Sequence, residues 1–207
     1  MYFTLEKVSN MNRFFYRSLL AIFMTLVYFM AYGQSGTDRQ VWHLSNTSQI
    51  IIEGSSNVNQ FQCQKQTYKG NDYLTEGSKN GQKVLSGHIS LSVSAFECDN
   101  STMTRDFMHT LKSDLHPKIR FEMHELVFSG CSNKTAIGSG IIRIAGESRA
   151  IRLHWTIDES KPGEIRLTAS KNLKFTTFNL TPPRKMMGLI QVHDDITVHF
   201  HLVLRQK

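Results

Sequence analysis

The chain has 207 residues, of which 40% are hydrophobic and 20% charged, and its formal net charge is +7. This length suits one domain with a real core. The basic residues are scattered, form no run that would follow a phosphate backbone and belong to no nucleic-acid motif, so nucleic acid is excluded as a partner. The charge is interpreted as solvated surface, with some attraction to anionic lipid headgroups.

Residues 1–33 have the layout of a secretory signal peptide. An apolar run over residues 19–31 follows a basic leader, and a small-x-small sequence ends at Gly33. The basic residues are Lys7, Arg13 and Arg17. A spanning helix needs about 20 apolar residues, so an uncleaved anchor is the weaker alternative. We expect a cleaved signal peptide over 1–33, one domain over 34–207, and a periplasmic or secreted protein.

Three stretches of strand are expected before any helix. They cover residues 41–44 together with 49–54, then 57–67, and then 85–98. In the third stretch Ile89, Leu91 and Val93 alternate with polar residues, which is typical of a half-buried strand. Residues 68–83 are polar and rich in Gly, Lys and Asn, so we expect a long exposed loop there.

Behind the leader, only residues 102–114 have a helical pattern. Met103, Phe107 and Leu111 stand at i, i+4 and i+8, which places one apolar stripe along a short helix. Asn100 and Ser101 are good N-cap types. His116-Pro117 is expected to end the helix, because the residue before a proline avoids the α region. The stripe should be buried against a β body, at the open end of a barrel.

Five more strands are expected after the helix, each with alternating apolar residues or bounded by turn residues. They cover residues 118–129, 136–144, 150–157, 164–173 and 195–204. Eight strands with one apolar side predict an antiparallel barrel or sandwich. An eight-stranded barrel is just wide enough to fill with side chains or to hold one ligand.

Several spaced patterns in the mature chain resemble the YceI-like family of polyisoprenoid-binding, lipocalin-like barrel proteins. These patterns are the helix block Asn100, Met103, Asp106, Leu111 and 117–121, the Gly140-x-Ile142-x-Ile144-x-Gly146 strand and turn, residues 175–183, and the closing Val192-x-Asp194-Asp195-Ile196-x-Val198. The resemblance implies a mainly β, eight-stranded antiparallel lipocalin-like barrel with one short helix at an open end. It also implies an exported protein whose apolar interior holds a long isoprenoid or fatty-acyl chain.

Inward apolar side chains would line that interior. The expected lining residues are Ile89, Leu91, Val93, Met103, Phe107, Leu111, Phe121, Ile142, Ile144, Leu153, Trp155, Phe178, Met187, Val198 and Phe200. Met186 and Met187 would suit a flexible gate, because thioethers adapt to irregular chains. The alternative for each residue is plain core packing, which is the commoner role of inward apolar residues.

Three cysteines remain behind the leader. Cys63 and Cys98 each stand two residues after a phenylalanine, which puts the Phe and the Cys on one face of a predicted strand. The two cysteines could therefore meet if those strands pair. A Cys63–Cys98 disulfide is favoured over free buried thiols, since export permits disulfides. Cys131 lies in a predicted turn and is the unpaired cysteine.

The sequence predicts no enzyme and no metal site. His199 and His201 share one strand face, but no Cys or carboxylate stands at ligand spacing with them. The nucleophile-elbow, phosphate-loop and zinc-protease motifs are absent from the sequence. No cofactor is expected beyond a bound lipid such as a polyisoprenoid or a fatty acid or amide.

Two functions from different classes remain. The first is an exported lipid-binding protein for transport, storage or stress. The second is a filled-core barrel that acts as a non-enzymatic interaction or stress-response module without a ligand. A cavity of about 300 Å³ or more, open at the helix end, would favour the first. Transient contact with a membrane surface and a homodimer are left open.

Overall fold

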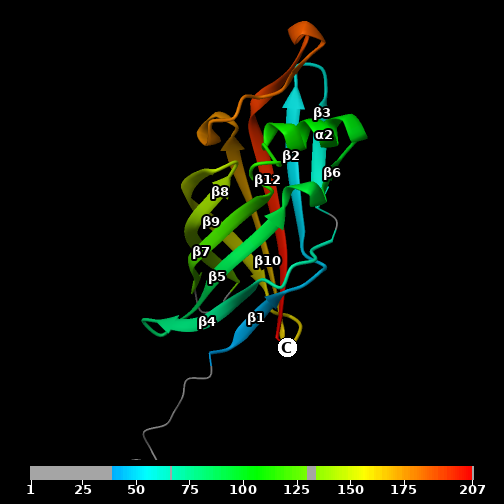
Figure 1. The fold of residues 1–207 in the computed structure, drawn as a ribbon. Coiled ribbons are helices and arrows are strands. Elements are labelled where there is room, and N and C mark those ends of the chain that lie inside the picture. Colours follow the sequence, from blue (N-terminus) through cyan, green and yellow to red (C-terminus); the bar gives the residue numbers. More distant parts are fainter. Residues whose placement is uncertain (1–38, 66, 130–133, 207) are drawn as a thin grey trace, which may run out of the picture. The chain divides into compact units, whose positions relative to one another are not determined.

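Antiparallel pairing joins the strands of the described chain into one sheet (Figure 1). The computed structural model describes residues 39–65, 67–129 and 134–206; the predicted signal peptide and Cys131 lie outside them. The first strands are β1 (Val41–Leu44), β2 (Gln49–Ser56), β3 (Gln60–Lys65), β4 (Tyr73–Lys79), β5 (Gln82–Ser92) and β6 (Phe96–Cys98). Helix α2 (Ser101–Thr110) follows, and then β7 (Lys118–Ser129), β8 (Thr135–Ile144), β9 (Glu147–Asp158), β10 (Glu164–Lys174), β11 (Arg184–Lys185) and β12 (Ile190–Gln206).

Eight of these strands close into a ring. The order is β1-β4-β5-β7-β8-β9-β10-β12, and β12 pairs back onto β1 with Leu204 opposite Leu44. Ring closure leaves no free edge in this part of the sheet, which is the usual solution for an antiparallel all-β chain. The predicted eight-stranded antiparallel barrel with one short helix is therefore confirmed.

The long strand β12 belongs to two parts of the wall. Its last residues pair with β1, while His201 and the residues before it pair with β2. A branch β2-β3-β6 extends from there, and β6 is the continuation of β5 after a single 3-10 turn, η1 (Val93–Ala95). The predicted third strand, 85–98, is thus one kinked strand whose two halves pair with different neighbours.

The prediction of a long exposed loop over residues 68–83 is wrong, because this segment contains β4. Asn80 and Gly81 form a two-residue turn between β4 and β5, with φ of 53° and 76°. Two positive φ angles match the twist of the flanking strands, and Asn-Gly is the preferred sequence for such a turn. Ala145 and Gly146 join β8 and β9 in the same way.

Helix α2 begins where predicted and ends earlier. The Asn100 side chain accepts a hydrogen bond from the Met103 N–H at 2.9 Å, so Asn100 is the N-cap. The helix stops at Thr110 rather than at residue 114, because Lys112 adopts a left-handed conformation with φ of 52°. A left-handed residue just past the last turn is a common helix end, and it acts here before Pro117 can.

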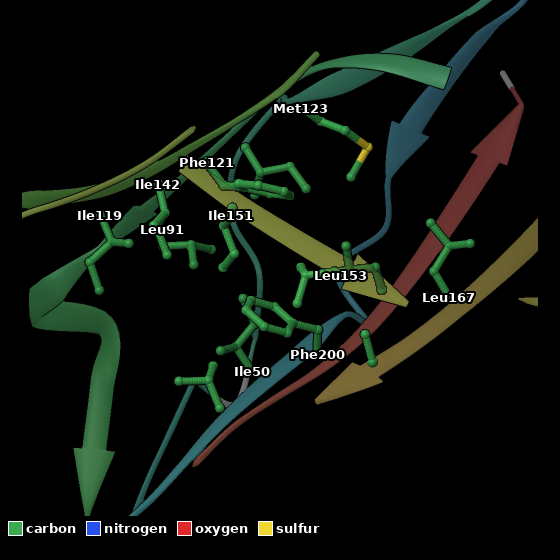
Figure 2. Close-up of a cluster of buried hydrophobic side chains, with 14 of the residues drawn as sticks. Ile50, Leu91, Ile119, Phe121, Met123, Ile142, Ile151, Leu153, Leu167 and Phe200 are labelled. Atoms are coloured by element: carbon green, nitrogen blue, oxygen red, sulfur yellow. The ribbon is translucent and has the colours of Figure 1, made fainter. Parts of the chain in front are cut away.

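The core lies inside the ring and includes fully buried side chains where β10 and β12 pair. The register places Ile165 opposite Leu204 and Leu167 opposite Leu202, and all four side chains are almost fully buried. Figure 2 shows the neighbouring layers, in which Leu91, Phe121 and Ile142 extend toward Ile50 and Phe200 from the opposite wall. The side chains of β10 and β12 therefore fill their end of the barrel, whereas Ile50, Leu91, Ile142 and Phe200 belong to layers nearer α2, where space for a ligand must be sought.

Candidate functional site

An apolar cavity of about 70 Å³ lies in the barrel near α2. Strands from both walls supply its lining, together with the end of α2 and the segment after β10. The lining residues are Ile50, Ile52, Phe61, Leu91, Phe96, Phe107, Leu111, Ile119, Ile142, Ile144, Leu173, Lys174, Phe175, Phe178, Leu180, Ile196, Val198 and Phe200. Only Lys174 is charged, and it is paired with Asp195 at 3.2 Å. A site of this kind suits hydrocarbon and offers nothing to a charged ligand.

A larger groove of about 460 Å³ lies beside the cavity, between α2, β2, β3 and the start of β12. Apolar side chains form much of its surface, among them Val58, Met103 and Ile190. Polar groups also contribute. Lys185 donates to Asp106 of α2 at 2.6 Å, which ties the β11 segment to the helix. The groove has the size of ordinary small-molecule sites, whereas the cavity is smaller than those sites.

Three phenylalanines line both the cavity and the groove: Phe61, Phe107 and Phe175. They come from β3, from α2 and from the residue after β10. The Phe61 ring lies across Gly54 on the neighbouring strand, where a Cβ atom would come within 2.4 Å of it. These three side chains therefore form the boundary between the cavity and the groove.

The segment that carries Phe175 and Phe178 is held by Asp194. The Thr176 hydroxyl and N–H donate to the Asp194 carboxylate at 2.6 and 2.9 Å. These hydrogen bonds lower the pKa of the Asp194 carboxyl. The turn η2 (Thr176–Phe178) then directs Phe178 into the interior, where it is buried. Asp194 thus positions part of the cavity wall from outside the barrel.

A disulfide between Cys63 and Cys98 fastens the other side of the site. The two cysteines stand opposite each other on β3 and β6, which are not consecutive strands. Cys63 also lines the groove, and the Cys98 N–H donates to the Thr104 hydroxyl of α2 at 3.0 Å. The covalent bond therefore fixes both β3 and the first turn of the helix.

The structure brings about half of the predicted lining residues together. The cavity is lined by Leu91, Phe107, Leu111, Ile142, Ile144, Phe178, Val198 and Phe200. Met103 lies in the groove instead. Five residues are buried in the core away from the cavity: Ile89, Val93, Phe121, Leu153 and Trp155. Met187 is fully exposed and lines neither space, because the turn that carries it projects into solvent.

Sequence reasoning missed several lining residues. They include Phe61 and Phe175, which stand at the cavity boundary, and Ile50, Ile52 and Ile119 on the barrel wall. Ile50 and Ile52 carried a usable signal, since they alternate on one face of a predicted strand. Phe175 carried none, because it follows a strand end and its direction depends on the η2 turn.

The described residues hold no group of three or more His, Cys, Asp or Glu side chains arranged to bind a metal ion. His199 instead contacts the Ser170 hydroxyl at 2.8 Å and the Glu53 carboxylate at 3.1 Å. A polar hollow of about 760 Å³ on the outer face of β5, β7 and β8 mixes basic and acidic side chains.

Within the described ranges, no helix is long and apolar enough to cross a bilayer.

Solved structures share this fold. A polyisoprenoid-binding domain from Saccharophagus degradans matches with a TM-score of 0.59 at 10% identity, covering 82% of this chain and 99% of that domain. Burkholderia cenocepacia BcnA matches with a TM-score of 0.58 at 14% identity, covering 76% and 96%. A Campylobacter jejuni YceI protein matches with a TM-score of 0.48 at 15% identity, covering 66% and 82%. No family model matches the sequence, and no curated protein does.

The chain therefore has a YceI-like fold, an antiparallel barrel with one short helix near its apolar cavity. The likeness rests on the arrangement of the strands rather than on sequence, which differs at most positions.

Proposed function

We propose that this protein is an exported, non-enzymatic lipid-binding protein that holds one long apolar chain at the helix end of its barrel. The observation that carries the proposal is the apolar cavity adjoining an apolar groove beneath α2. The Saccharophagus domain of the same fold is a polyisoprenoid-binding domain, which supports a polyisoprenoid or fatty-acyl ligand. Burial of such a chain contributes about 0.8 kcal/mol per CH₂. The role would be transport, storage or a stress response, in the periplasm or outside the cell.

The ligand would occupy the groove first and the barrel second. The cavity of about 70 Å³ is too small for a long chain, while the groove of about 460 Å³ lies within the usual range for ligands. Rotation of Phe61, Phe107 and Phe175 would extend the groove into the cavity. Both Phe61 and Phe107 are only partly buried, so their rings have solvent space on the groove side.

Native mass spectrometry of the protein purified from its own host tests the proposal. We expect a stoichiometric adduct of isoprenoid or fatty-acyl mass, released by lipid extraction. Val198→Phe should shift the adduct to shorter chains or lower its occupancy, because Val198 is buried in β12 and lines the cavity into which the groove would extend. Val203→Phe is the matched control, since Val203 lies on the opposite face of the same strand and should keep the adduct. An adduct unchanged by Val198→Phe would contradict the placement.

The small volume of the cavity favours a second candidate function, a barrel that acts through its outer surface without a ligand. The interior near β1 is already filled, and about 70 Å³ holds no lipid unless side chains move. A ligand-free mass that persists after isoprenoids and fatty acids are added would support this candidate. The partner would then be sought on the outer face of the barrel.

A further inference from the structure

Two loops carry exposed apolar side chains at the same end of the barrel. Val58 lies in the β2–β3 turn, and Met186, Met187 and Leu189 lie in the β11–β12 hairpin; we call these four residues the apolar tip. Their exposed fractions are 62%, 67%, 109% and 70%. Asn57 donates its side-chain N–H to the Leu189 carbonyl at 2.8 Å and accepts from the Gln191 N–H at 2.9 Å. These hydrogen bonds join the two loops, and Figure 1 shows them projecting together at the top.

The backbone of the tip is held in an unfavourable conformation. Met186 and Met187 have φ of 50° and 56°, and Gly188 follows with φ of 93°. Side chains other than Gly and Asn adopt this region uncommonly, and two methionines in succession are therefore costly. Neither methionine is buried, so packing within this chain does not offset the cost. A binding role would explain why the turn presents apolar side chains there.

Among the described residues, the tip has one unpaired cation beside it, Arg184. Residues 54–60 and 181–193, which contain the two loops, include Arg184 and Lys185 and no Asp or Glu. Lys185 is paired with Asp106, while Arg184 is exposed and has no ion-pair partner among the described residues. Apolar side chains at the apex would contact the hydrocarbon of an anionic bilayer, while Arg184, next to them in the chain, would contact its phosphate groups.

We propose that the apolar tip docks this protein on anionic lipid bilayers, with Met186, Met187 and Leu189 inserted at the boundary between the headgroups and the acyl chains. The tip adjoins the groove beneath α2, since Val58 belongs to both, and Lys185 and Ile190, which flank the other three tip residues in the chain, line that groove. Docking would therefore place the groove mouth against the hydrocarbon from which an apolar chain is taken. The transfer of an apolar chain into the groove rests on the proposed function, whereas docking on vesicles can be measured without a bound lipid.

Vesicle flotation tests the docking. The probes are phosphatidylcholine vesicles with and without phosphatidylglycerol. Wild-type protein should bind the anionic vesicles, and added salt should weaken binding by screening Arg184. The Met186→Ser, Met187→Ser, Leu189→Ser triple variant should lose about tenfold or more in partitioning, since each buried methylene contributes to insertion. Leu115→Ser is the matched control, because Leu115 is 77% exposed in the turn after α2 and outside the tip.

The inference is overturned if wild-type protein does not bind anionic vesicles, or if the triple variant binds them as wild type does. Equal binding to neutral vesicles would overturn the role of Arg184. Uptake of a fatty acid added from solution, followed by native mass spectrometry, separates this result from the proposed function. The triple variant should take up the fatty acid as wild type does. A protein that docks on vesicles but never takes up a lipid would contradict the proposed function alone.

Discussion

A buried polar cluster beside β3 contains Lys65, Tyr68 and Asp72. The Tyr68 hydroxyl donates to the Asp72 carboxylate at 2.5 Å, and that carboxylate also accepts the Ser90 N–H. Lys65 donates to the Thr67 carbonyl at 2.6 Å, and burial lowers its pKa. Burial, together with the hydrogen bond to Asp72, raises the pKa of Tyr68 well above its ordinary value. The cluster fixes residues 67–72, which connect to β4.

Tyr68→Phe should make stability less dependent on alkaline pH. Because the folded state raises the pKa of Tyr68 above about 10, the stabilisation is complete below pH 10 and falls as pH rises beyond it. At pH 7 the variant should lose about 1–3 kcal/mol, the value of a hydrogen bond to a charged group. Urea unfolding of both proteins at pH 7 and at pH 11 measures this. A difference that stays constant or widens above pH 10 would contradict the assignment.

Gly140 is required by the close approach of β7 and β8. A Cβ atom at Gly140 would lie 2.0 Å from the Glu122 carbonyl oxygen, next to an irregularity in the β7 register. Gly140→Ala should therefore lower the free energy of unfolding by about 1–3 kcal/mol, as overpacking does. Gly77→Ala is the control, because no atom lies within 4 Å of the added carbon. Equal urea midpoints for the two variants would show that the strands separate without cost.

At the scale of elements, helix α2 is fastened mainly at its first turn. The Asn100 cap, the Cys98–Thr104 hydrogen bond and the disulfide all act there, while no residue within the helix is fully buried. The far end makes its main buried contact through Leu111, which lines the cavity. A movement of the helix about its first turn would carry Phe107 away from the cavity boundary and would break the Lys185–Asp106 pair.

Removal of the disulfide should loosen this element. The double variant Cys63→Ala, Cys98→Ala should lose about 2–4 kcal/mol, because the bond closes a long chain segment between residues 35 apart. Amide exchange in Ser101–Thr110 should accelerate more than exchange in β9 and β10. Cys131→Ala, which keeps the bond, serves as the control for thiol removal. Uniform acceleration across the barrel would mean that the bond stabilises the whole sheet rather than the helix.

Regular elements were predictable from the sequence, whereas irregular ones were not. Period-two alternation identified β7, β9 and β12, because each has one buried face. The polar composition of residues 68–83 hid β4, although Asn80-Gly81 is itself a hairpin signal. The site was harder to predict, because side chains point inward both where the barrel is packed and where it is hollow. Alternation in the sequence does not distinguish the two. Trp155 and Phe200 have the same pattern, yet only Phe200 lines the cavity.

At the scale of the whole described barrel, packing differs between its two ends. Near the β1–β12 pair the core is filled by residues such as Leu167, Leu202 and Leu204. Near α2, the side chains that line the cavity have no neighbouring atoms on the side that faces the empty space, and the groove adjoins this cavity. A lining atom without neighbours has already lost part of its dispersion energy, so this end contributes less stability per side chain. The filled end therefore contributes more of the stability of the fold than the helix end does.

Two leucine truncations test this division. Leu167→Ala should lose about 3–5 kcal/mol, because a fully buried leucine leaves a new cavity in a filled core. Leu180→Ala should lose less, since Leu180 borders the existing cavity. Thermal melts with and without palmitate give the second readout, because a ligand of the folded state raises Tm. Palmitate should raise Tm more in Leu180→Ala, whose cavity is larger, than in wild type, and Leu167→Ala should match wild type. Equal losses of stability would contradict the difference in packing between the two ends. A larger palmitate shift in Leu167→Ala than in Leu180→Ala would place the ligand space at the other end of the barrel.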